Sequence, residues 1–329
     1  MKVVVCKAYG SADVLQLEEV PMPVCKDNEI LIRIRAATVS AGDTRARRGT
    51  RESLPLWPLS KLAMGIQRPR HPILGVELAG EVVQVGRTAT RFREGDAVYA
   101  ASGMGWGAYA EYKAMSEHGA VAMKPANLTY EEAAAVPVGA LSALFFLRKG
   151  GIQRGQQVLI YGASGSVGTY AVQLAKHFGA VVTAVCSTGN VSMMKELGAD
   201  RVIDYSQEDF TTIDTKVDMI LDTVGKTTFS SCRRLLQPRG RYILAVFNFK
   251  EVGQMLWTSL FSGQKVVCGV ADERIEDLEL LRELIEAGAV KPVIDRSYTL
   301  DQIREAHRYV EQGHKKGNVV ITMDNDDNL

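Results

Sequence analysis

The sequence predicts an α/β protein that combines a doubly wound parallel sheet with a second, mainly β domain. Three observations lead to this prediction. Residues 1–123 consist of short apolar runs separated by turn residues, the middle of the chain alternates strand and helix patterns, and one of these strands ends in the glycine-rich turn GASGSVG at 162–168. Alternating strands and helices build a parallel sheet that is covered on both faces.

Composition agrees with a folded protein of two domains. The 329 residues are 46% hydrophobic and 23% charged, with a net charge of +1, so nothing predicts a nucleic-acid partner or an acidic surface. The five cysteines are scattered and form no CxxC pair, which argues against a disulfide framework or a cysteine metal site and suits a reducing compartment. No apolar run reaches the roughly 18 residues of a spanning helix. We therefore expect a cytoplasmic protein with no membrane span.

The first part of the chain predicts strands. Apolar runs rich in β-branched residues occur at 3–9, 29–39, 78–86 and 96–100, and turn residues separate them. This part is therefore expected to be mostly sheet.

From residue 131 the pattern changes to helix and then alternates. The stretch 131–150 is rich in alanine and has apolar residues at helical spacing, which predicts helix. Two helices, which end near residues 178 and 197, are expected between the first three strands of the parallel sheet. A helix, a strand, a helix and a closing strand are expected at 274–288, 293–298, 300–313 and 317–323. The strands of the parallel sheet are expected at 158–161, 181–186, 201–204, 219–222, 241–246 and 265–270.

The glycine-rich turn predicts a dinucleotide site. It follows a predicted strand and precedes a helix with one apolar face, from Val167 to Phe178. The unpaired N–H groups of a helix N-terminus favour a pyrophosphate, and a residue without Cβ lets the phosphate approach the backbone. The predicted contacts in this turn are Gly162, Ser164, Gly165, Ser166, Val167 and Gly168.

The end of the second strand indicates which dinucleotide is bound. An acidic residue there would accept hydrogen bonds from the ribose and repel a 2′-phosphate. This sequence has Ser187 and Thr188 instead, and Tyr205 after the third strand is expected to close the pocket. No Arg or Lys occupies the strand end. The missing repulsion favours NADPH over NADH.

The chain resembles the medium-chain dehydrogenase/reductase superfamily, and within it the zinc-free quinone oxidoreductase and enoyl reductase branch, whose members are often named NAD(P)-dependent alcohol dehydrogenases. The resemblance covers nearly the whole chain and is carried by HPILGVELAGEVVQVG, FREGDAVYA, EEAAAVPVGALSA, GASGSVG, LGADRVIDY, DTVG and GHKKGNVVIT. It implies a split GroES-like catalytic domain at 1–123 and 291–329, a Rossmann domain at 124–290, and an active site in the cleft between them.

The resemblance also allows the zinc positions of the family to be inspected. The zinc alcohol dehydrogenases bind the catalytic metal through Cys, His and Cys. Here Ser40, Val76 and either Val138 or Gly139 stand at those positions. None offers a sulfur or nitrogen ligand, so no zinc site is expected.

Without zinc, a conjugated acceptor is the expected substrate. Hydride delivery to an isolated carbonyl builds an alkoxide that a Lewis acid would normally stabilise. In an enone or a quinone the charge delocalises, so hydrogen-bond donors suffice. The candidate donors are Ser40 and Arg45, where the family commonly has Asn and Tyr; a purely structural role is equally open for both. Asp43 and Thr44 are expected to cap the helix that starts there.

Family correspondence adds further cofactor contacts at strand ends and in loops. Val138 and Ser142 are expected near the nicotinamide. The remaining contacts are Asp222, Val224, Ala245, Phe247, Gly269 and Asn318.

Residues 49–72 form a long connection with many leucines, a tryptophan and several cations. Such loops are usually functional or disordered, and we expect a lid over a bulky apolar acceptor; a surface resting on a partner or a membrane is the alternative. The function expected is NADPH-dependent reduction of quinones or α,β-unsaturated carbonyls. The alternatives are an NAD(P)-dependent alcohol or aldehyde oxidoreductase and a non-catalytic nucleotide-binding partner protein. A homodimer joined through the strand at 265–270 is a family expectation.

Overall fold

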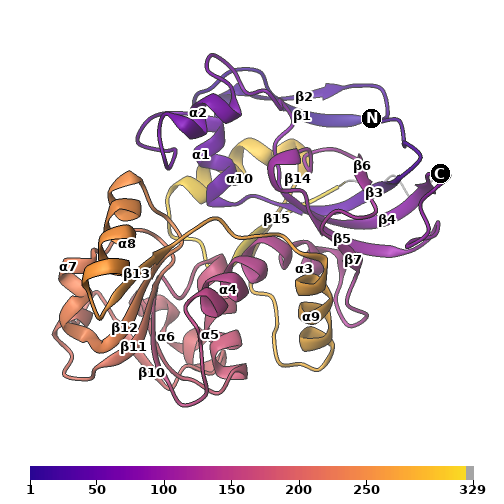
Figure 1. Cartoon of the computed structure of the whole chain (residues 1–329). Coiled ribbons are helices and arrows are strands. Elements are labelled where there is room, and N and C mark those ends of the chain that lie inside the picture. The colour runs from indigo at the N-terminus through magenta and orange to yellow at the C-terminus, as the bar shows by residue number, and fades with distance from the viewer. Residues whose placement is uncertain (324–329) are drawn as a thin grey trace. The chain divides into compact units, whose positions relative to one another are not determined.

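A mixed sheet organises the first of two units into which the chain divides. The computed structural model describes residues 1–323, and the first unit contains residues 1–138, 273–288 and those from 292 on. Its sheet has the order β14-β15-β3-β4-β5-β7, with β6 also paired to β3 (Figure 1). The strands are β3 (Glu29–Thr38), β4 (Glu77–Val85), β5 (Ala97–Ala101), β6 (Tyr112–Ser116), β7 (Val121–Met123), β14 (Ile294–Thr299) and β15 (Asn318–Thr322).

Short helices and a hairpin complete this unit. The hairpin pairs β1 (Lys2–Cys6) with β2 (Leu15–Glu19). β15 pairs antiparallel with β3, and β14 pairs with β15, so the last two strands join the sheet formed by β3 to β7. The helices are α1 (Ala41–Arg48), α2 (Leu59–Met64), α3 (Tyr130–Ala134), α9 (Ile275–Glu286) and α10 (Ile303–Glu311).

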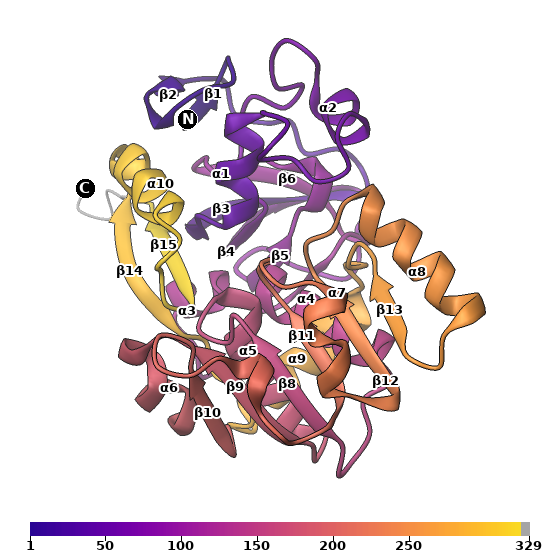
Figure 2. The same ribbon diagram turned by 90° about the vertical axis from the view of Figure 1, so that its left-hand side faces the viewer.

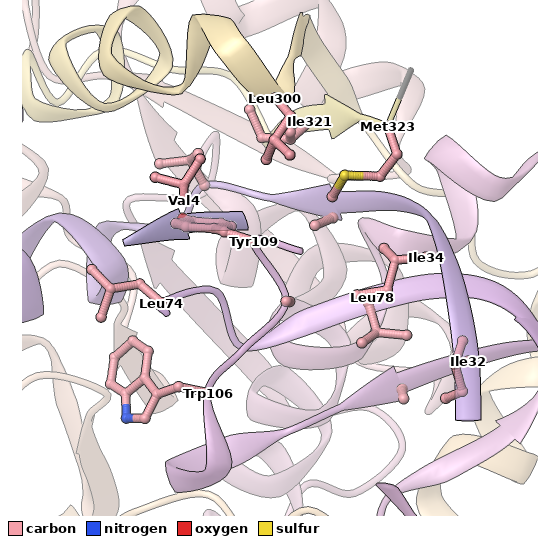
Figure 3. Close-up of a cluster of buried hydrophobic side chains, with 14 of the residues drawn as sticks. Val4, Ile32, Ile34, Leu74, Leu78, Trp106, Tyr109, Leu300, Ile321 and Met323 are labelled. Carbon is pink, nitrogen blue, oxygen red and sulfur yellow. The ribbon is translucent and has the colours of Figure 1, made fainter. Parts of the chain in front are cut away.

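The core of the first unit lies on the sheet and gathers residues far apart in sequence. Figure 3 shows Tyr109 next to Val4, with Ile32, Ile34 and Leu78 along the strands. These side chains are buried because alternate residues of β3 and β4 point to the same face. The C-terminal residues Leu300, Ile321 and Met323 belong to the same cluster.

The second unit, residues 139–272 with 289–291, is built on a six-stranded parallel sheet. Its order is β10-β9-β8-β11-β12-β13, as Figure 2 displays. The strands are β8 (Gln157–Tyr161), β9 (Val181–Cys186), β10 (Arg201–Asp204), β11 (Val217–Asp222), β12 (Leu236–Leu244) and β13 (Lys265–Cys268). The helices are α4 (Pro137–Lys149), which begins at the change of unit, α5 (Ser166–His177), α6 (Val191–Glu196), α7 (Phe229–Cys232) and α8 (Phe249–Phe261).

In the structure the first unit gives way to the second between residues 138 and 139, whereas the sequence predicts a domain boundary between residues 123 and 124. α3 packs on β3, β4 and β5, which keeps residues up to Val138 with the first sheet. Residues 273–288 also belong to the first unit, because α9 packs on β7 and the Tyr99 hydroxyl donates to the Leu278 carbonyl at 2.6 Å. Within residues 1–323, none of the helices combines the length and apolar character needed to cross a bilayer.

Candidate functional site

The glycine-rich turn connects β8 to α5 in the geometry that a phosphate site requires. Gly162 has a φ of 76°, which a residue with a side chain rarely adopts. A Cβ on Gly168 would lie 2.3 Å from the carbonyl oxygen of Gly162, so only glycine lets the first turn of α5 pack this closely. Gly165 is the N-cap and offers no side chain to the first N–H groups of the helix. Those donors are therefore suited to bind an anion.

The order of the strands places this turn at a switch point of the sheet. From β8 the chain proceeds to β9 and β10 on one side, and β11, β12 and β13 lie on the other. In open α/β sheets, ligands bind beyond the carboxyl ends of the strands at such a reversal. The strands end in register, since Tyr161 pairs with Asp222 and Asp222 with Leu244.

Most of the predicted cofactor contacts of the second unit gather at this carboxyl edge. Ser142 is different, because it lies within α4. The residues at the ends of the six strands, in the turns that follow or in the first turn of α5 are Gly162, Ser164, Gly165, Ser166, Val167, Gly168, Ser187, Thr188, Tyr205, Asp222, Val224, Ala245, Phe247 and Gly269.

The end of β9 holds a feature that sequence reasoning missed. Asp204 ends β10 and is paired with Cys186, the last residue of β9. Its carboxylate accepts a hydrogen bond from the Thr188 side chain, which is the main cause of the lowered pKa of Asp204. A carboxylate therefore does lie beside the predicted ribose pocket, on the neighbouring strand. The signal was present in the sequence as the final residue of RVID, but only the register of the two strands assigns its place.

Two other residues of the predicted ribose pocket also make hydrogen bonds within the protein. The Ser187 hydroxyl oxygen accepts a hydrogen bond from the Asn190 side-chain amide at 3.0 Å. The backbone N–H of Tyr205 donates to the Cys186 carbonyl at 3.0 Å, and half of the Tyr205 side chain is exposed. The phenol therefore stands at the surface of this edge, available to a ligand.

Asp222 shapes its turn with its carboxylate. The side chain is buried and accepts hydrogen bonds from the N–H groups of Val224, Gly225 and Thr227 and from the Thr227 hydroxyl, at 2.7 to 2.9 Å. Both carboxylate oxygens are engaged in this way. Asp222 thus fixes the loop after β11, and its own carboxylate is directed to that loop.

In the first unit, Ser40 is the N-cap of α1. Its hydroxyl donates to the Asp43 carboxylate at 2.5 Å and accepts from the Asp43 N–H at 3.2 Å, and the Ser40 N–H donates to the same carboxylate oxygen at 2.7 Å. The expected capping role of Asp43 is therefore observed. Thr44 instead donates to the carbonyl of Ala41.

Arg45, the second candidate donor, lies one turn further along α1. Its side chain is half-buried, and burial lowers the pKa of its guanidinium. Removing a cation from water is costly, which gives Arg45 a reason to bind an anion.

A buried carboxylate that sequence reasoning did not single out lies behind these residues. Glu77, the first residue of β4, is buried and accepts hydrogen bonds from the Thr38 hydroxyl and, at 2.8 Å, from the Val138 N–H. Burial raises the pKa of Glu77 to about 7, and nearby Lys315 has its pKa lowered by burial to about 8. The available signal was an acidic residue directly before the uncharged stretch Leu78–Gly80 of the strand.

The two predicted cofactor contacts of this unit are also engaged. Val138 binds Glu77 through its N–H. The side-chain amide of Asn318 donates to the Val293 carbonyl at 3.2 Å, and the residue is buried. Asn318 therefore holds the start of β15.

The residues at the family's zinc positions do not fit a zinc ion. The Ser40 hydroxyl is committed to the helix cap, and Val76 and Val138 carry no donor. Residues 1–323 contain no group of three or more His, Cys, Asp or Glu side chains placed to hold a metal. A tetrahedral site needs such a set.

Comparisons with known proteins agree with this fold. A family model described as "Alcohol dehydrogenase GroES-like domain" matches residues 26–125, and one described as "Zinc-binding dehydrogenase" matches residues 197–321. The 2-methylene-furan-3-one reductase of Solanum lycopersicum is 36% identical over 328 residues, covering 95% of this chain and 76% of that protein. The chain belongs to the medium-chain dehydrogenase/reductase superfamily. Within the superfamily it falls in the quinone oxidoreductase-like branch, and it is therefore an oxidoreductase. The fold class predicted from the sequence is confirmed.

Further relatives of this superfamily match over most of their length. The NADPH-dependent alkenal/one oxidoreductase of Arabidopsis thaliana chloroplasts is 30% identical, with 98% of this chain and 79% of that protein covered. Among solved structures, the quinone oxidoreductase from Coxiella burnetii has a TM-score of 0.87 and 29% identity, with 98% and 99% of the two chains covered.

Proposed function

We propose that this chain is an NADPH-dependent reductase of quinones or α,β-unsaturated carbonyls that works without zinc. The observation that carries the proposal is the glycine turn at the switch point of the parallel sheet, with free helix N–H groups and a backbone that only glycine allows. The names of the Solanum, Arabidopsis and Coxiella proteins support the acceptor class.

The residues present fit a nicotinamide dinucleotide. The first turn of α5 would hold its pyrophosphate, and the turns after β9 and β10 would hold its adenosine ribose. When bound, the reduced nicotinamide supplies a hydride. The protein's part is to orient the acceptor, to exclude water and to stabilise the charge that develops on the acceptor's oxygen.

The hydrogen-bond donors at and near the first of the family's zinc positions support a conjugated acceptor. Ser40 and Arg45 offer a hydroxyl and a guanidinium but no metal ligand. Such donors suffice where the negative charge spreads over an enolate or a hydroquinone. An isolated carbonyl would build a localised alkoxide, which places alcohol or aldehyde oxidoreduction second.

We infer NADPH as the preferred cofactor because the strand that ends at Cys186 is followed by Ser187 and Thr188, which carry no charge to repel a 2′-phosphate. Asp204 lies on the neighbouring strand, and its carboxylate accepts a hydrogen bond from the Thr188 side chain. The hydrogen bond keeps this carboxylate ionised, so its charge opposes a 2′-phosphate from the neighbouring strand. The preference is therefore expected to be moderate.

Initial rates test the proposal directly. Oxidation of NADPH and NADH is followed separately with a small quinone, an enone, a 2-alkenal and a saturated aldehyde, with zinc content measured on the same sample. We expect turnover of the three conjugated acceptors with NADPH. Binding of NADPH without turnover of any acceptor would instead support a non-catalytic nucleotide-binding protein, since a fold alone does not establish activity.

Two further expectations remain proposals. β13 is an edge strand of the six-stranded sheet, and pairing of two such edges would give a homodimer; light scattering of the purified protein tests it. The cytoplasmic location stays a prediction that cell fractionation tests.

A further inference from the structure

The capping box of α1 differs from the other capping boxes that residues 1–323 contain. In each box a side chain at the third helical position binds back to the N-cap residue. In four of them that residue is exposed or half-exposed, whereas Asp43 is fully buried. A cap needs no burial, and burying a carboxylate is costly. The four comparison residues are Glu132, Ser231, Glu251 and Gln302.

The Asp43 carboxyl also has an oxygen that capping does not use. Oδ2 receives both hydrogen bonds from Ser40, while Oδ1 is buried and receives neither of them. The Gly75 N–H also acts on this carboxyl as a donor. The Tyr109 hydroxyl is likewise buried and lies within hydrogen-bonding reach of this carboxyl. One oxygen of Asp43 thus contacts Ser40, and the other faces the interior.

The buried polar groups continue beyond Tyr109. The His307 ring packs edge-on against the Tyr109 ring, with 5.7 Å between centroids, and both His307 nitrogens are buried without partners in residues 1–323. Arg47 is buried beside them and pairs through one nitrogen with Glu311, while Nε and Nη1 have no partner there. The Asp43, Tyr109, His307 and Arg47 side chains thus form a buried polar cluster, in which two His307 nitrogens and two Arg47 nitrogens have no partner among residues 1–323. Buried polar groups of this kind are usually satisfied by ordered water.

We propose that Asp43 is a positioning residue that passes a proton to Ser40 and is reprotonated through the Tyr109 and His307 side chains of this cluster. This inference rests on the proposed function. As hydride adds to the β-carbon of an enone, the acceptor's oxygen takes the Ser40 hydroxyl proton, and Ser40 takes the Asp43 carboxyl proton. Asp43 is left ionised and regains a proton from solvent through the cluster. The enol product then tautomerises to the saturated carbonyl; a quinone gains its O–H in the same way.

Protonation of Asp43 also determines where the Ser40 hydroxyl points. When Asp43 is ionised, Ser40 donates to it and cannot donate elsewhere; when Asp43 is protonated, it donates to Ser40 and frees the serine proton. Burial raises the pKa of Asp43 to about 6, although Ser40 and the Gly75 N–H oppose this rise. Glu77 and Tyr109 are the other titratable groups that interact with Asp43.

The main test compares pH profiles of kcat for wild type and Asp43→Asn, an enone being the acceptor. Because the protonated form is the active one, wild-type kcat is expected to fall about tenfold per pH unit above pH 6. Asp43→Asn can accept the Ser40 N–H but has no proton to pass. Its kcat is expected to be lower by on the order of 10² at pH 6 and independent of pH, with a smaller solvent isotope effect.

Two control variants separate this role from capping and from Glu77. Glu132→Gln alters the exposed capping box of α3 and is expected to leave the profile unchanged. Glu77→Gln removes the other raised carboxyl and is expected to keep the falling limb. Loss of the limb in Glu77→Gln, or an unchanged profile in Asp43→Asn, would overturn the inference.

A second readout needs no turnover. Infrared difference spectra of the full chain without cofactor should show a protonated carboxyl that titrates near pH 6 and is missing in Asp43→Asn. If that variant does not fold, Tyr109→Phe removes only the hydroxyl and is expected to shift the same band and to lower kcat roughly tenfold. A titration near the ordinary value of about 4 would contradict the relay. Absence of turnover in wild type would refute the proposed function, whereas the infrared titration decides on Asp43 separately.

Discussion

Gly168 offers the sharpest test of the dinucleotide site. In Gly168→Ala the new Cβ would lie 2.3 Å from the Gly162 carbonyl oxygen and 2.6 Å from the Ala163 Cα, whereas real Cβ contacts stay beyond 3.0 Å. The first turn of α5 must therefore move by at least about 0.7 Å. Both contacts are with backbone atoms, so no side chain can rotate away to relieve them.

The expected loss follows from that displacement. Overpacking costs about 1–3 kcal/mol of folding free energy, and a displacement near 1 Å costs about 10²-fold where geometry must be held. We therefore expect the Kd for NADPH to rise roughly tenfold to hundredfold, or about 1.4–2.7 kcal/mol. Nucleotide fluorescence titration measures Kd, and thermal unfolding measures stability on the same samples.

Gly253→Ala in α8 is the matched control. Its Cβ would meet nothing within 4 Å, so the change should raise helix stability by about 0.5–1 kcal/mol and leave NADPH binding unaltered. If Gly168→Ala bound NADPH as tightly as wild type, the pyrophosphate would not sit on the first turn of α5, and the site would have to be sought elsewhere.

Four further predictions address single features of the two units. Ser187→Asp places a carboxylate after β9 and should shift the ratio of Kd values toward NADH; an unchanged ratio would misplace the ribose pocket. Asp222→Ala removes the acceptor of three backbone N–H groups and of the Thr227 hydroxyl, which keeps its contact with the Tyr242 hydroxyl, and should lower the free energy of unfolding by about 1–3 kcal/mol in urea titrations. Burial lowers the pKa of His307 to about 3, so stability is complete above its ordinary value of 6.5 and falls by up to about 1.4 kcal/mol per unit as pH drops from 6.5 toward 3; His307→Gln should flatten that part of the curve. Leu59→Ser with Leu62→Ser changes two exposed side chains of α2 and should lower kcat/KM for long-chain quinones more than for small ones, whereas an equal effect on both would exclude the lid.

Local patterns made the second unit predictable from the sequence. The glycine turn, the strand before it and the helix after it are each determined by residues that are close in the sequence. β9 and β10 have the predicted bounds, 181–186 and 201–204. The helix expected at 131–150 is divided into α3 and α4, because Pro137 lacks the N–H that a continuous helix needs and instead starts a new one.

Contacts between segments that are distant in the sequence could not be predicted. Asp204 faces Thr188 through the register of two parallel strands. Thr38, Glu77 and Val138 meet from three separate elements, and the Asp43 cluster joins residues more than 250 positions apart. The spacing of apolar residues predicts helices and strands, but it does not predict which buried polar groups meet. Each of these polar residues occupies a position where the pattern predicts an apolar one.

The central claim is hydride transfer to a conjugated acceptor without a metal ion. Its most direct measurement is the rate of NADPH oxidation with an enone, taken before and after exhaustive chelation, on protein of known zinc content. We expect the same rate in both samples, zinc well below one ion per chain, and no rate with a saturated aldehyde. A rate that vanishes on chelation and returns with zinc would contradict the account.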